Sequence, residues 1–305
     1  MRNITMTLPT AVPSLVWGWK ELFGLCKIKV VAVMLVCTAV GMALATPGLP
    51  PLTNVILGLA GIGLASCGAA AFNHVIDRRL DAVMTRTSRR PVASKRLPVA
   101  IALGWACLLS VAGVALLAWQ VNHLTAALTF ASLIGYALIY TAFLKRATPQ
   151  NIVIGGVAGA APPLLGWVAI TGQITPEPLL LMLIIFAWTP PHFWALAIHK
   201  RDDYARAGIP MLPVTHGIPF TRLQIWLYGW LTVLTTLLPV MIGMSGALYL
   251  FIVVCLNARF MVWNWRVWRG QDPAAPIGAF WFSIRYLLGV FGALILDHYA
   301  STLVW

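Results

Sequence analysis

The fold class of this chain is decided by residues 52–81, LTNVILGLAGIGLASCGAAAFNHVIDRRLD. The first two-thirds of this stretch contain no charged side chain. About 20 mostly apolar residues are enough for a helix to cross the roughly 30 Å hydrocarbon core of a bilayer. The stretch then ends in polar residues that include Asn73, Asp77 and Asp81. It therefore predicts a transmembrane helix, over about 52–75, with a polar site at one end.

The rest of the chain repeats the apolar pattern. Of its 305 residues, 60% are hydrophobic and 10% are charged, whereas an ordinary soluble domain is about 25% charged. The same length criterion predicts nine spans, at residues 30–46, 52–75, 97–118, 122–144, 151–172, 177–199, 223–243, 246–265 and 277–297. Residues 1–305 are therefore expected to form a single all-α integral membrane domain with nine transmembrane helices.

The placement of Lys and Arg predicts the orientation of these spans. Basic residues occur in the N-terminal segment 1–29 and after spans 2, 4, 6 and 8, whereas the loops after spans 1, 3, 5 and 7 contain none. Because basic loops face the cytoplasm, we expect a bacterial inner-membrane protein with a cytoplasmic N-terminus and a periplasmic C-terminus. This topology accounts for much of the net charge of +13. The charge also suits anionic membrane lipid, and it requires no nucleic-acid partner.

Two of the basic loops, 76–96 and 200–222, stand out by their length and by their mixture of acidic, basic and proline residues. They lie four spans apart, and each follows a span whose last turns carry polar residues. We interpret this similarity as a sign of two related four-helix halves followed by a ninth helix. The other connections are short, which favours antiparallel neighbours.

The first loop contains the strongest candidate site. Asn73, Asp77 and Asp81 are spaced four apart, so on a helix they project from one face. Magnesium favours one or two carboxylates, with phosphates and water completing its octahedron, and Arg78 beside them could hold diphosphate oxygens. The alternative is a charged helix end that pairs with the bases of its own loop. Ionisable residues at the end of a membrane helix favour the functional interpretation.

The sixth span carries a second cluster. Pro190 and Pro191 interrupt its hydrogen-bond ladder, which is tolerated where a helix lines a cavity or packs on protein. His192 follows directly, and we interpret it as a ligand or an acid–base group, the alternative being a hydrogen-bonded structural histidine. His199 and Asp203 repeat the spacing of the first site. Neighbouring candidates are the flanking Trp194 and the cations Lys200 and Arg201.

A third patch contains Tyr140, Lys145 and Arg146. The two cations are either phosphate-binding groups or ordinary positive-inside anchors. The glycines Gly155, Gly156 and Gly159 that follow fit close helix packing better than phosphate binding. Together the three patches suit an amphiphile with a diphosphate head and an apolar tail. Magnesium and cations would stabilise departing diphosphate, and a dry aromatic cavity would protect the allylic cation from water.

The segments that carry these residues resemble the UbiA superfamily of intramembrane prenyltransferases, and within it the protohaem IX farnesyltransferase branch. The matching segments are Asn73-His-Val-Ile-Asp77-Arg-Arg-Leu-Asp81, Thr85-Arg-Thr-Ser-Arg-Arg-Pro91, residues 140–167 with Lys145-Arg146-Ala-Thr148, Thr189-Pro-Pro-His192-Phe-Trp194 and Asp203-Tyr-Ala-Arg-Ala-Gly-Ile-Pro-Met-Leu-Pro213. The first segment indicates the superfamily alone. The Pro-Pro-His-Phe-Trp and Gly-Ile-Pro-Met-Leu-Pro segments indicate the branch.

The resemblance implies nine helices around a central cavity, capped by the loops 76–96 and 200–222. It also implies magnesium-dependent transfer of farnesyl from farnesyl diphosphate to a vinyl group of haem b, with water addition, which gives haem O and diphosphate. Haem O serves haem–copper terminal oxidases. The partner that takes the product, haem A synthase or terminal oxidase assembly, is left open by the sequence.

The resemblance also assigns roles residue by residue. Magnesium and diphosphate would be held by Asn73, Asp77 and Asp81, with Arg78, Lys145, Arg146 and Asp203 assisting. The haem side would involve His192, His199, Lys200, Arg201, Trp194 and Tyr140, with His192 as a candidate haem contact. Many superfamily members carry a full second aspartate motif where this chain has His199, Asp202 and Asp203. This departure leaves a symmetric second magnesium site open.

Two other functions were weighed against haem prenylation. Transfer to an aromatic acid, a quinone precursor or chlorophyllide shares the first motif, but the Pro-Pro-His-Phe-Trp segment argues against it. A transporter or a haem-delivering assembly factor predicts ionisable groups near the membrane midplane. Only Arg259 and Arg285, of 21 basic residues, fall inside predicted spans. The carboxylates of the two motif loops gather at the rim, which favours catalysis at the surface.

Overall fold

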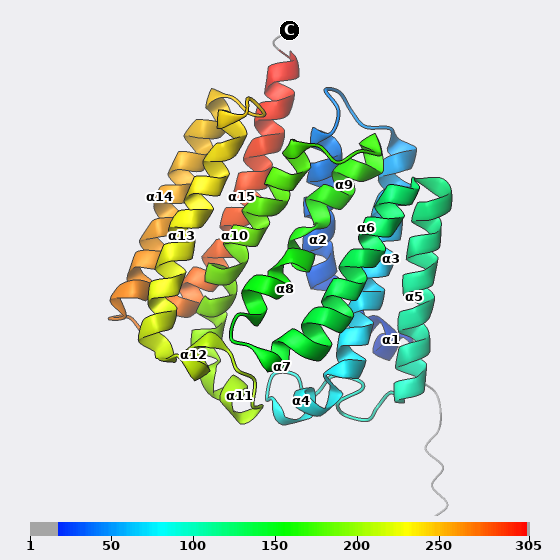
Figure 1. Cartoon of the computed structure of the whole chain (residues 1–305), viewed down its shortest axis with the longest axis vertical. Coiled ribbons are helices and arrows are strands. Elements are labelled where there is room, and N and C mark those ends of the chain that lie inside the picture. Colours follow the sequence, from blue (N-terminus) through cyan, green and yellow to red (C-terminus); the bar gives the residue numbers. More distant parts are fainter. Residues whose placement is uncertain (1–17, 304–305) are drawn as a thin grey trace, which may run out of the picture.

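The structure, a computed structural model, describes residues 18–303, and these residues form helices and connecting loops without a strand. The first part of the predicted cytoplasmic segment 1–29, residues 1–17, lies outside the described residues, as do residues 304–305. The helices are α1 Trp19–Leu25, α2 Ile28–Leu44, α3 Leu52–Ile76, α4 Arg78–Val83, α5 Val99–Gln120, α6 His123–Ile134, η1 Gly135–Leu144, α7 Lys145–Ala147, α8 Asn151–Ala160, α9 Pro162–Thr171, α10 Pro176–His199, α11 Arg201–Arg206, α12 Leu212–Thr215, α13 Gly217–Met241, α14 Ala247–Arg269 and α15 Ala275–Leu303. Figure 1 shows their arrangement.

The predicted spans are confirmed by the described helices. Within residues 18–303, eight helical segments are long and apolar enough to cross a membrane, and α1 with α2, bent by 52°, supplies a ninth. The observed helices extend past several predicted edges, since α13 begins at Gly217 and α14 continues to Arg269. The apolar criterion locates only the part in hydrocarbon, whereas the backbone ladder continues beyond it.

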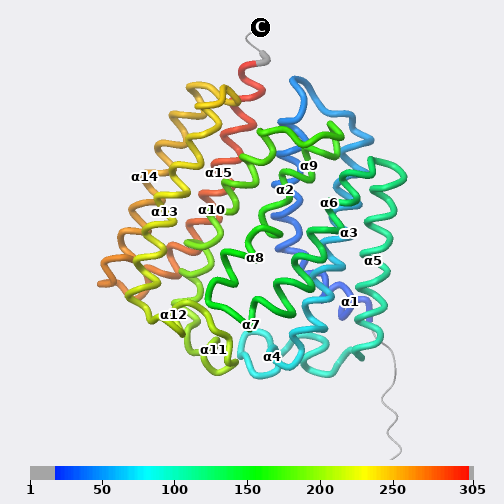
Figure 2. The backbone as a smooth tube through the Cα atoms, viewed as in Figure 1, coloured from blue at the N-terminus to red at the C-terminus, as the bar shows by residue number. Residues whose placement is uncertain are grey.

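The bundle has one end that is covered by short helices. Figure 1 places α4, α7, α11 and α12 together there, and Figure 2 traces the loops that lead into them. We call this the capped end. Met84 of the first predicted cap loop packs in one cluster with Tyr204 and Met211 of the second. Thr85 donates a hydrogen bond to Asp203 across the two loops at 3.3 Å. The prediction that loops 76–96 and 200–222 form a common cap is therefore confirmed.

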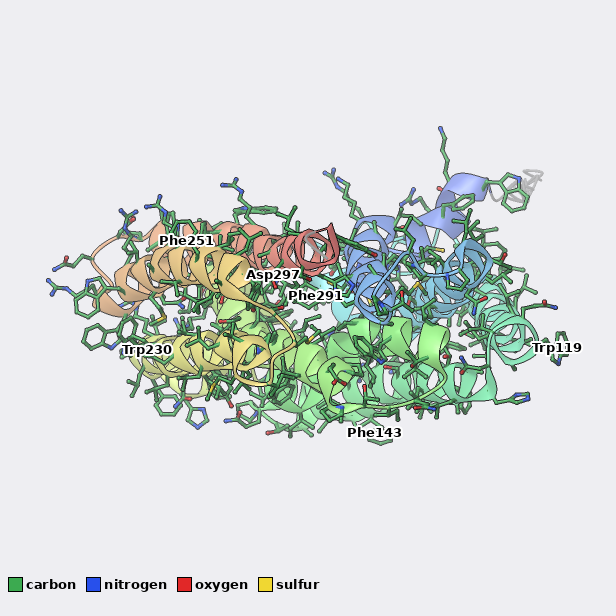
Figure 3. The ribbon with its side chains drawn as sticks, turned by 90° about the horizontal axis from the view of Figure 1, so that it is seen from above. Trp119, Phe143, Trp230, Phe251, Phe291 and Asp297 are labelled. Carbon is green, nitrogen blue, oxygen red and sulfur yellow. The ribbon has the colours of Figure 1, made fainter. Side chains whose placement is uncertain are left out.

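Large apolar side chains cover the outside of the bundle, as expected for a surface that faces lipid. Figure 3 shows Trp119, Phe143, Trp230 and Phe251 at the perimeter, and their exposed fractions are 80%, 69%, 47% and 70%. Asp297, by contrast, is buried and accepts hydrogen bonds from two backbone N–H groups at the start of α14, those of Gly246 and Tyr249. The acid therefore caps a helix N-terminus.

The two intramembrane arginines do not form a polar pathway. Arg259 of α14 and Arg285 of α15 are both exposed, and neither lines the central cavity described below. The transporter hypothesis needs ionisable groups that face a conduit at this depth. Their position on the outside removes the main residues that favoured it.

The double proline of α10 interrupts hydrogen bonding without breaking the helix. The prediction of an interrupted ladder is correct, but α10 continues as one helix from Pro176 to His199. Because Pro191 has no N–H, the carbonyl of Ala187 lacks its usual partner. Thr232 of α13 donates to that carbonyl at 3.0 Å. A neighbouring helix thus satisfies the freed acceptor, as is common for prolines in membrane helices.

The glycines of the fifth span have two different roles. A Cβ at Gly155 would lie 2.1 Å from the Tyr140 ring, and one at Gly156 would lie 3.4 Å from Thr189. Both were predicted to serve packing, and this is confirmed. Gly159 differs, because a Cβ there would meet nothing within 4 Å and the residue lines the central cavity. Its assignment to packing was wrong, since a spacing pattern does not distinguish a helix contact from a cavity wall.

Candidate active site

A cavity of about 260 Å³ lies inside the bundle. It is lined by α2, α3, α6, η1, α8, α9 and α10, so five of the nine spans enclose it and α13–α15 do not contribute. We call it the central cavity. Its walls are mostly apolar, and its polar lining residues are Lys27, Ser66, Thr129, Ser132, Tyr136 and Thr189. An apolar chamber of this kind suits a hydrocarbon chain better than a charged group.

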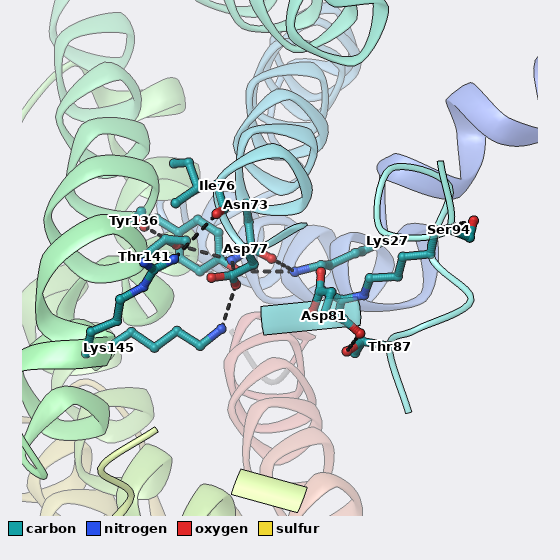
Figure 4. Close-up of polar contacts among 12 residues, drawn as sticks. Lys27, Asn73, Ile76, Asp77, Asp81, Thr87, Ser94, Tyr136, Thr141 and Lys145 are labelled. Atoms are coloured by element: carbon teal, nitrogen blue, oxygen red, sulfur yellow. Dashed lines mark hydrogen bonds and ion pairs between the residues drawn. The ribbon is translucent and has the colours of Figure 1, made fainter. Parts of the chain in front are cut away.

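The first predicted site residue lies at the mouth of this cavity. Asn73, in the last turn of α3, accepts a hydrogen bond at 2.5 Å from the ammonium of Lys27, a cavity-lining residue. The amide nitrogen of Asn73 donates to Asp77 Oδ2 at 2.9 Å and to Thr141 Oγ1 at 3.3 Å. Figure 4 shows these contacts. The amide therefore joins the apolar chamber to the carboxylate next to it.

Asp77 is the most buried acid of the site, with a side chain that is 1% exposed. It stands between the end of α3 and the start of α4. Its Oδ2 forms an ion pair at 2.6 Å with Lys145, at the start of α7. Its Oδ1 is buried and has no hydrogen-bond partner among the described residues. A buried carboxylate oxygen without a partner is costly, so this atom is available for a ligand.

Asp81 is engaged by an arginine of its own loop. One nitrogen of Arg90, Nη1, lies 2.9 Å from Oδ1 and 2.8 Å from Oδ2 of Asp81, whose side chain is 3% exposed. Thr87 donates to the Asp81 carbonyl at 3.2 Å and fixes the loop. The predicted polar stripe of Asn73, Asp77 and Asp81 is therefore present and buried. Each member has a cationic partner, which offsets the cost of burying charge.

The π-helix η1 shapes the opposite wall of the mouth. Thr141 donates back to the carbonyl of Tyr136, five residues earlier, at 2.8 Å. Tyr136 stacks on Tyr140 with ring centroids 5.8 Å apart, and its hydroxyl lies 3.5 Å from the Lys27 ammonium. Segments of π-helix occur often at functional sites. Here the extra residue per turn lets Thr141 reach Asn73 while Tyr136 faces the cavity.

The other predicted cations contact the chain at different points. Arg78 donates to the Val75 carbonyl at 2.8 Å, and Arg146 lies 3.5 Å from the Ile76 carbonyl, so both hold the end of α3 and neither pairs with a carboxylate there. Arg201 donates to the Pro213 carbonyl at 3.1 Å inside the second cap loop. The described structure thus makes Lys145 the predicted cation that contacts the acids directly.

The second predicted acidic site stays separate from the first. Asp203 pairs with Arg206 and accepts from Thr85, so its contacts lie within the cap. His199 is exposed, and Lys200 is partly buried. Tyr204 is buried beside them, and burial raises the pKa of its hydroxyl above the ordinary value. The described contacts of this group therefore support a cap-forming role.

The conserved-looking segment of α10 divides into a core residue and an open one. Trp194 is 1% exposed and packs edge-on against Tyr228 at 5.3 Å, so it serves the core instead of the cavity wall where it was expected. His192 is partly exposed, and its ring lies between the rings of Trp188 and Phe280, at 4.2 Å and 4.6 Å. Trp188 and Thr189 line the central cavity one turn away.

Sequence reasoning missed several residues of the site. Lys27 and Arg90 looked like ordinary topological anchors, and Thr141 gave no polar pattern within its span. Lys27 has a left-handed backbone, with φ 47°, which is uncommon for a residue with a side chain. His74 is also buried beside the stripe, and neither of its ring nitrogens has a partner among the described residues. A polar residue next to a motif residue was the available signal.

The residues present fit a magnesium–diphosphate group. No set of three His, Cys, Asp or Glu side chains that could hold a metal occurs within the described part of the chain. Magnesium, however, needs only one or two carboxylates when phosphates and water complete its shell. The unpartnered Oδ1 of Asp77 supplies one such ligand. Lys27, Arg90 and Lys145 provide the positive charge that a diphosphate requires.

The fold and the site together define a polytopic membrane protein with an apolar chamber whose mouth carries buried acids and clustered cations. The family model described as "UbiA prenyltransferase family" matches residues 34–288. The chain belongs to the UbiA prenyltransferase family, as the sequence resemblance indicated. Its all-helical fold and the family agree with the prediction of an integral membrane prenyltransferase.

Curated relatives cover nearly the whole chain. "Protoheme IX farnesyltransferase 1" of Pseudomonas putida is 57% identical over 92% of this chain and 95% of its own length. "Protoheme IX farnesyltransferase" of Azotobacter vinelandii is 57% identical over 92% and 94%. The protein of the same name from Hahella chejuensis is 53% identical over 98% of both chains.

Solved structures agree on the fold at low sequence identity. A digeranylgeranylglyceryl phosphate synthase has a TM-score of 0.77 at 16% identity, covering 92% of this chain and 98% of that one. A UbiA homologue from Archaeoglobus fulgidus, bound to DMAPP and Mg²⁺, has a TM-score of 0.64 at 15% identity, covering 90% and 99%. These likenesses establish a shared helical architecture.

Proposed function

We propose that this protein transfers a farnesyl group from farnesyl diphosphate to a vinyl group of haem b, with magnesium as its cofactor. Relatives at 53–57% identity carry the name of this activity and match almost full length. The observation that carries the donor half is the Asn73–Asp77–Lys145 cluster at the mouth of an apolar cavity. We further propose that the capped end faces the cytoplasm of a bacterial inner membrane, because the basic loops gather there.

The donor site separates head from tail. Asp77, through its free Oδ1, and Asn73 and Asp81 would hold magnesium and the diphosphate oxygens. The metal, when bound, neutralises diphosphate charge and so makes it a better leaving group. Lys27 and Lys145 flank the same position and stabilise the negative charge that grows on the departing oxygen. Lys145, which offsets Asp77 in the described structure, becomes available to diphosphate once Asp77 has another cationic partner.

The tail occupies the central cavity. Apolar walls exclude water, and the aromatic rings of Tyr136 and Trp188 line the same chamber. Exclusion of water protects an allylic cation from hydrolysis, and aromatic faces attract positive charge. The farnesyl chain therefore lies away from solvent while its first carbon stays at the mouth, beside Lys27.

The reaction then joins two carbons and adds water. The bond between C1 of farnesyl and the diphosphate oxygen breaks, and its electron pair leaves with the diphosphate. The vinyl π electrons of haem b form the new bond to C1 and leave a cation on the carbon next to the porphyrin ring. A water oxygen binds that carbon and releases one proton to solvent. The product thus carries a farnesyl group and a hydroxyl group across the former vinyl bond.

The proposal is tested by chromatography and mass spectrometry of purified protein with haem b, farnesyl diphosphate and magnesium. Asp77→Asn, Asp81→Asn and a chelator are run beside the wild type. We expect a haem product that has gained farnesyl and hydroxyl, and we expect it to disappear in both variants and with chelator. Folded, haem-binding wild type that makes no such product would refute the assignment. A parallel reaction with an aromatic-acid acceptor tests the competing prenyl acceptor directly.

A further inference from the structure

The side chain of His192 has only one open edge. Trp188 and Phe280 cover the two faces of its ring with centroid distances of 4.2 Å and 4.6 Å. Nδ1 lies 2.7 Å from Ser283 Oγ. Nε2, on the remaining edge, has no hydrogen-bond partner in residues 18–303, and it is absent from the buried unpartnered atoms of that range. The ring is thus fixed in orientation, and Nε2 remains accessible.

The hydrogen bonds around Ser283 determine which ring nitrogen carries the proton. A serine hydroxyl has one hydrogen to donate. Ser283 donates it to the Phe280 carbonyl at 2.7 Å. Its oxygen must therefore accept from His192, so the proton of the neutral imidazole sits on Nδ1. Nε2 then carries an exposed lone pair, which is the form in which histidine binds metal ions.

The location of this lone pair matches the acceptor half of the reaction. Trp188 and Thr189, on the turn of α10 before His192, line the central cavity. His192 lies farther along α10 toward the capped end, the same end that carries Asp77 and Lys145. Trp188 is itself fixed, because its Nε1 donates to the Ser283 carbonyl at 2.9 Å. α15 therefore orients both rings beside the chamber that accepts the prenyl chain.

We infer that His192 Nε2 is the axial ligand of the iron of the porphyrin acceptor, and that Ser283 is the positioning residue that fixes its tautomer. The inference rests on the proposed function in taking an iron porphyrin as acceptor. Metal-bound histidines usually donate their second N–H to an oxygen, which orients the ring and raises its basicity. Coordination at Nε2 lies in the ring plane, and that plane is fixed by the two stacked aromatic rings.

The test compares haem b with iron-free protoporphyrin IX on the full-length purified protein. Binding is followed by the Soret band, and ligation by resonance Raman and electron paramagnetic resonance. The wild type is expected to show histidine ligation and to bind haem b at least tenfold more tightly than protoporphyrin IX. His192→Ala should lose the histidine signature and this preference, and added imidazole should restore the ligated spectrum. His216→Ala, an exposed histidine outside the span, is the matched control.

Ser283 is tested through the ligand it positions. Ser283→Ala removes the acceptor for Nδ1–H, and loss of such an outer partner weakens metal affinity by about 10–100-fold. We expect a weaker haem b complex with a shifted iron–histidine vibration, while affinity for protoporphyrin IX stays unchanged. Ser283→Thr retains the hydroxyl and should restore the vibration. An equal loss for both porphyrins would indicate simple packing damage and overturn the positioning role.

Several outcomes separate this inference from the proposed function. Wild-type protein without a histidine ligand on its haem would overturn the inference even if every variant failed to fold. Unchanged haem spectra in His192→Ala, with turnover lost, would do the same and would make His192 an acid–base group. Farnesylated product from either protein would leave the proposed function intact. Histidine-ligated haem with no product would support the ligand and refute the transferase.

Discussion

Lys145 and Asp77 form a buried ion pair in which only one carboxylate oxygen takes part. Lys145 Nζ lies 2.6 Å from Oδ2, and the two side chains are 14% and 1% exposed. The same Oδ2 also accepts from Asn73 at 2.9 Å. Oδ1 is left buried without a partner in the described part of the chain. The acid is therefore neutralised on one side and open on the other, as a ligand-free metal site requires.

Removing Lys145 is expected to destabilise the protein in a way that magnesium corrects. Breaking one side of a buried ion pair costs about 3–5 kcal/mol, because the remaining charge is uncompensated. We expect Lys145→Ala to lower the unfolding temperature in detergent and to respond to added magnesium with a larger upward shift than the wild type. Asp77→Asn in the Lys145→Ala background should recover the loss. Lys145→Ala with unchanged thermal stability would show that the pair is not energetically coupled.

Arg90 is expected to control affinity for the prenyl diphosphate as well as the charge of Asp81. Its Nη1 contacts both oxygens of Asp81, and its side chain is 22% exposed. We expect Arg90→Ala to weaken binding of farnesyl diphosphate by more than tenfold, measured by calorimetry with magnesium present. Arg90→Lys should fall between, because lysine keeps the charge without the guanidinium geometry. Exposed Arg89→Ala is the control. Equal affinities for Arg89→Ala and Arg90→Ala would exclude a specific role.

The sequence predicted the membrane architecture well because the apolar run lengths and the alternating basic loops are imposed by the bilayer itself. It also identified Asp77 and Lys145, which the structure brings together although they lie 68 residues apart. Lys27 escaped notice because a basic residue before a span is expected for topology alone. Its contact with Asn73 depends on the bend between α1 and α2, which no periodic pattern encodes.

Trp194 and His192 illustrate the limit from another direction. They lie two positions apart in one motif, yet one is 1% exposed in the core and the other has an open ring edge. Which of them faces a cavity depends on the rotation of α10 against α13 and α15. That rotation is set by tertiary contacts such as the one between Thr232 and the Ala187 carbonyl. The partner Ser283 comes from a different helix, so motif spacing gives no sign of it.

The hydroxyl of Thr232 is expected to stabilise the proline-containing helix. It donates at 3.0 Å to the Ala187 carbonyl that Pro191 leaves without a partner. Thr232→Val keeps the shape but removes the donor, and an unsatisfied buried acceptor costs about 1–3 kcal/mol. We expect a lower unfolding temperature for Thr232→Val and near-normal stability for Thr232→Ser. A valine variant as stable as wild type would show that this carbonyl finds another donor.

Gly159 is expected to set the length of the prenyl chain that the central cavity accepts. A Cβ at this position meets nothing within 4 Å, and the residue lines the cavity, so a larger side chain should enter the chamber without disturbing the helices. A leucine there removes volume that the end of a farnesyl chain would occupy. Gly159→Leu should therefore lower kcat/KM for farnesyl diphosphate at least tenfold while geranyl diphosphate is affected less, measured by product mass spectrometry. Gly104→Leu, at an exposed position of α5 that is equally open, is the matched control and should leave both donors unchanged. If the two donors lost activity equally in Gly159→Leu, and the protein remained folded, the prenyl chain would have to lie elsewhere in the bundle.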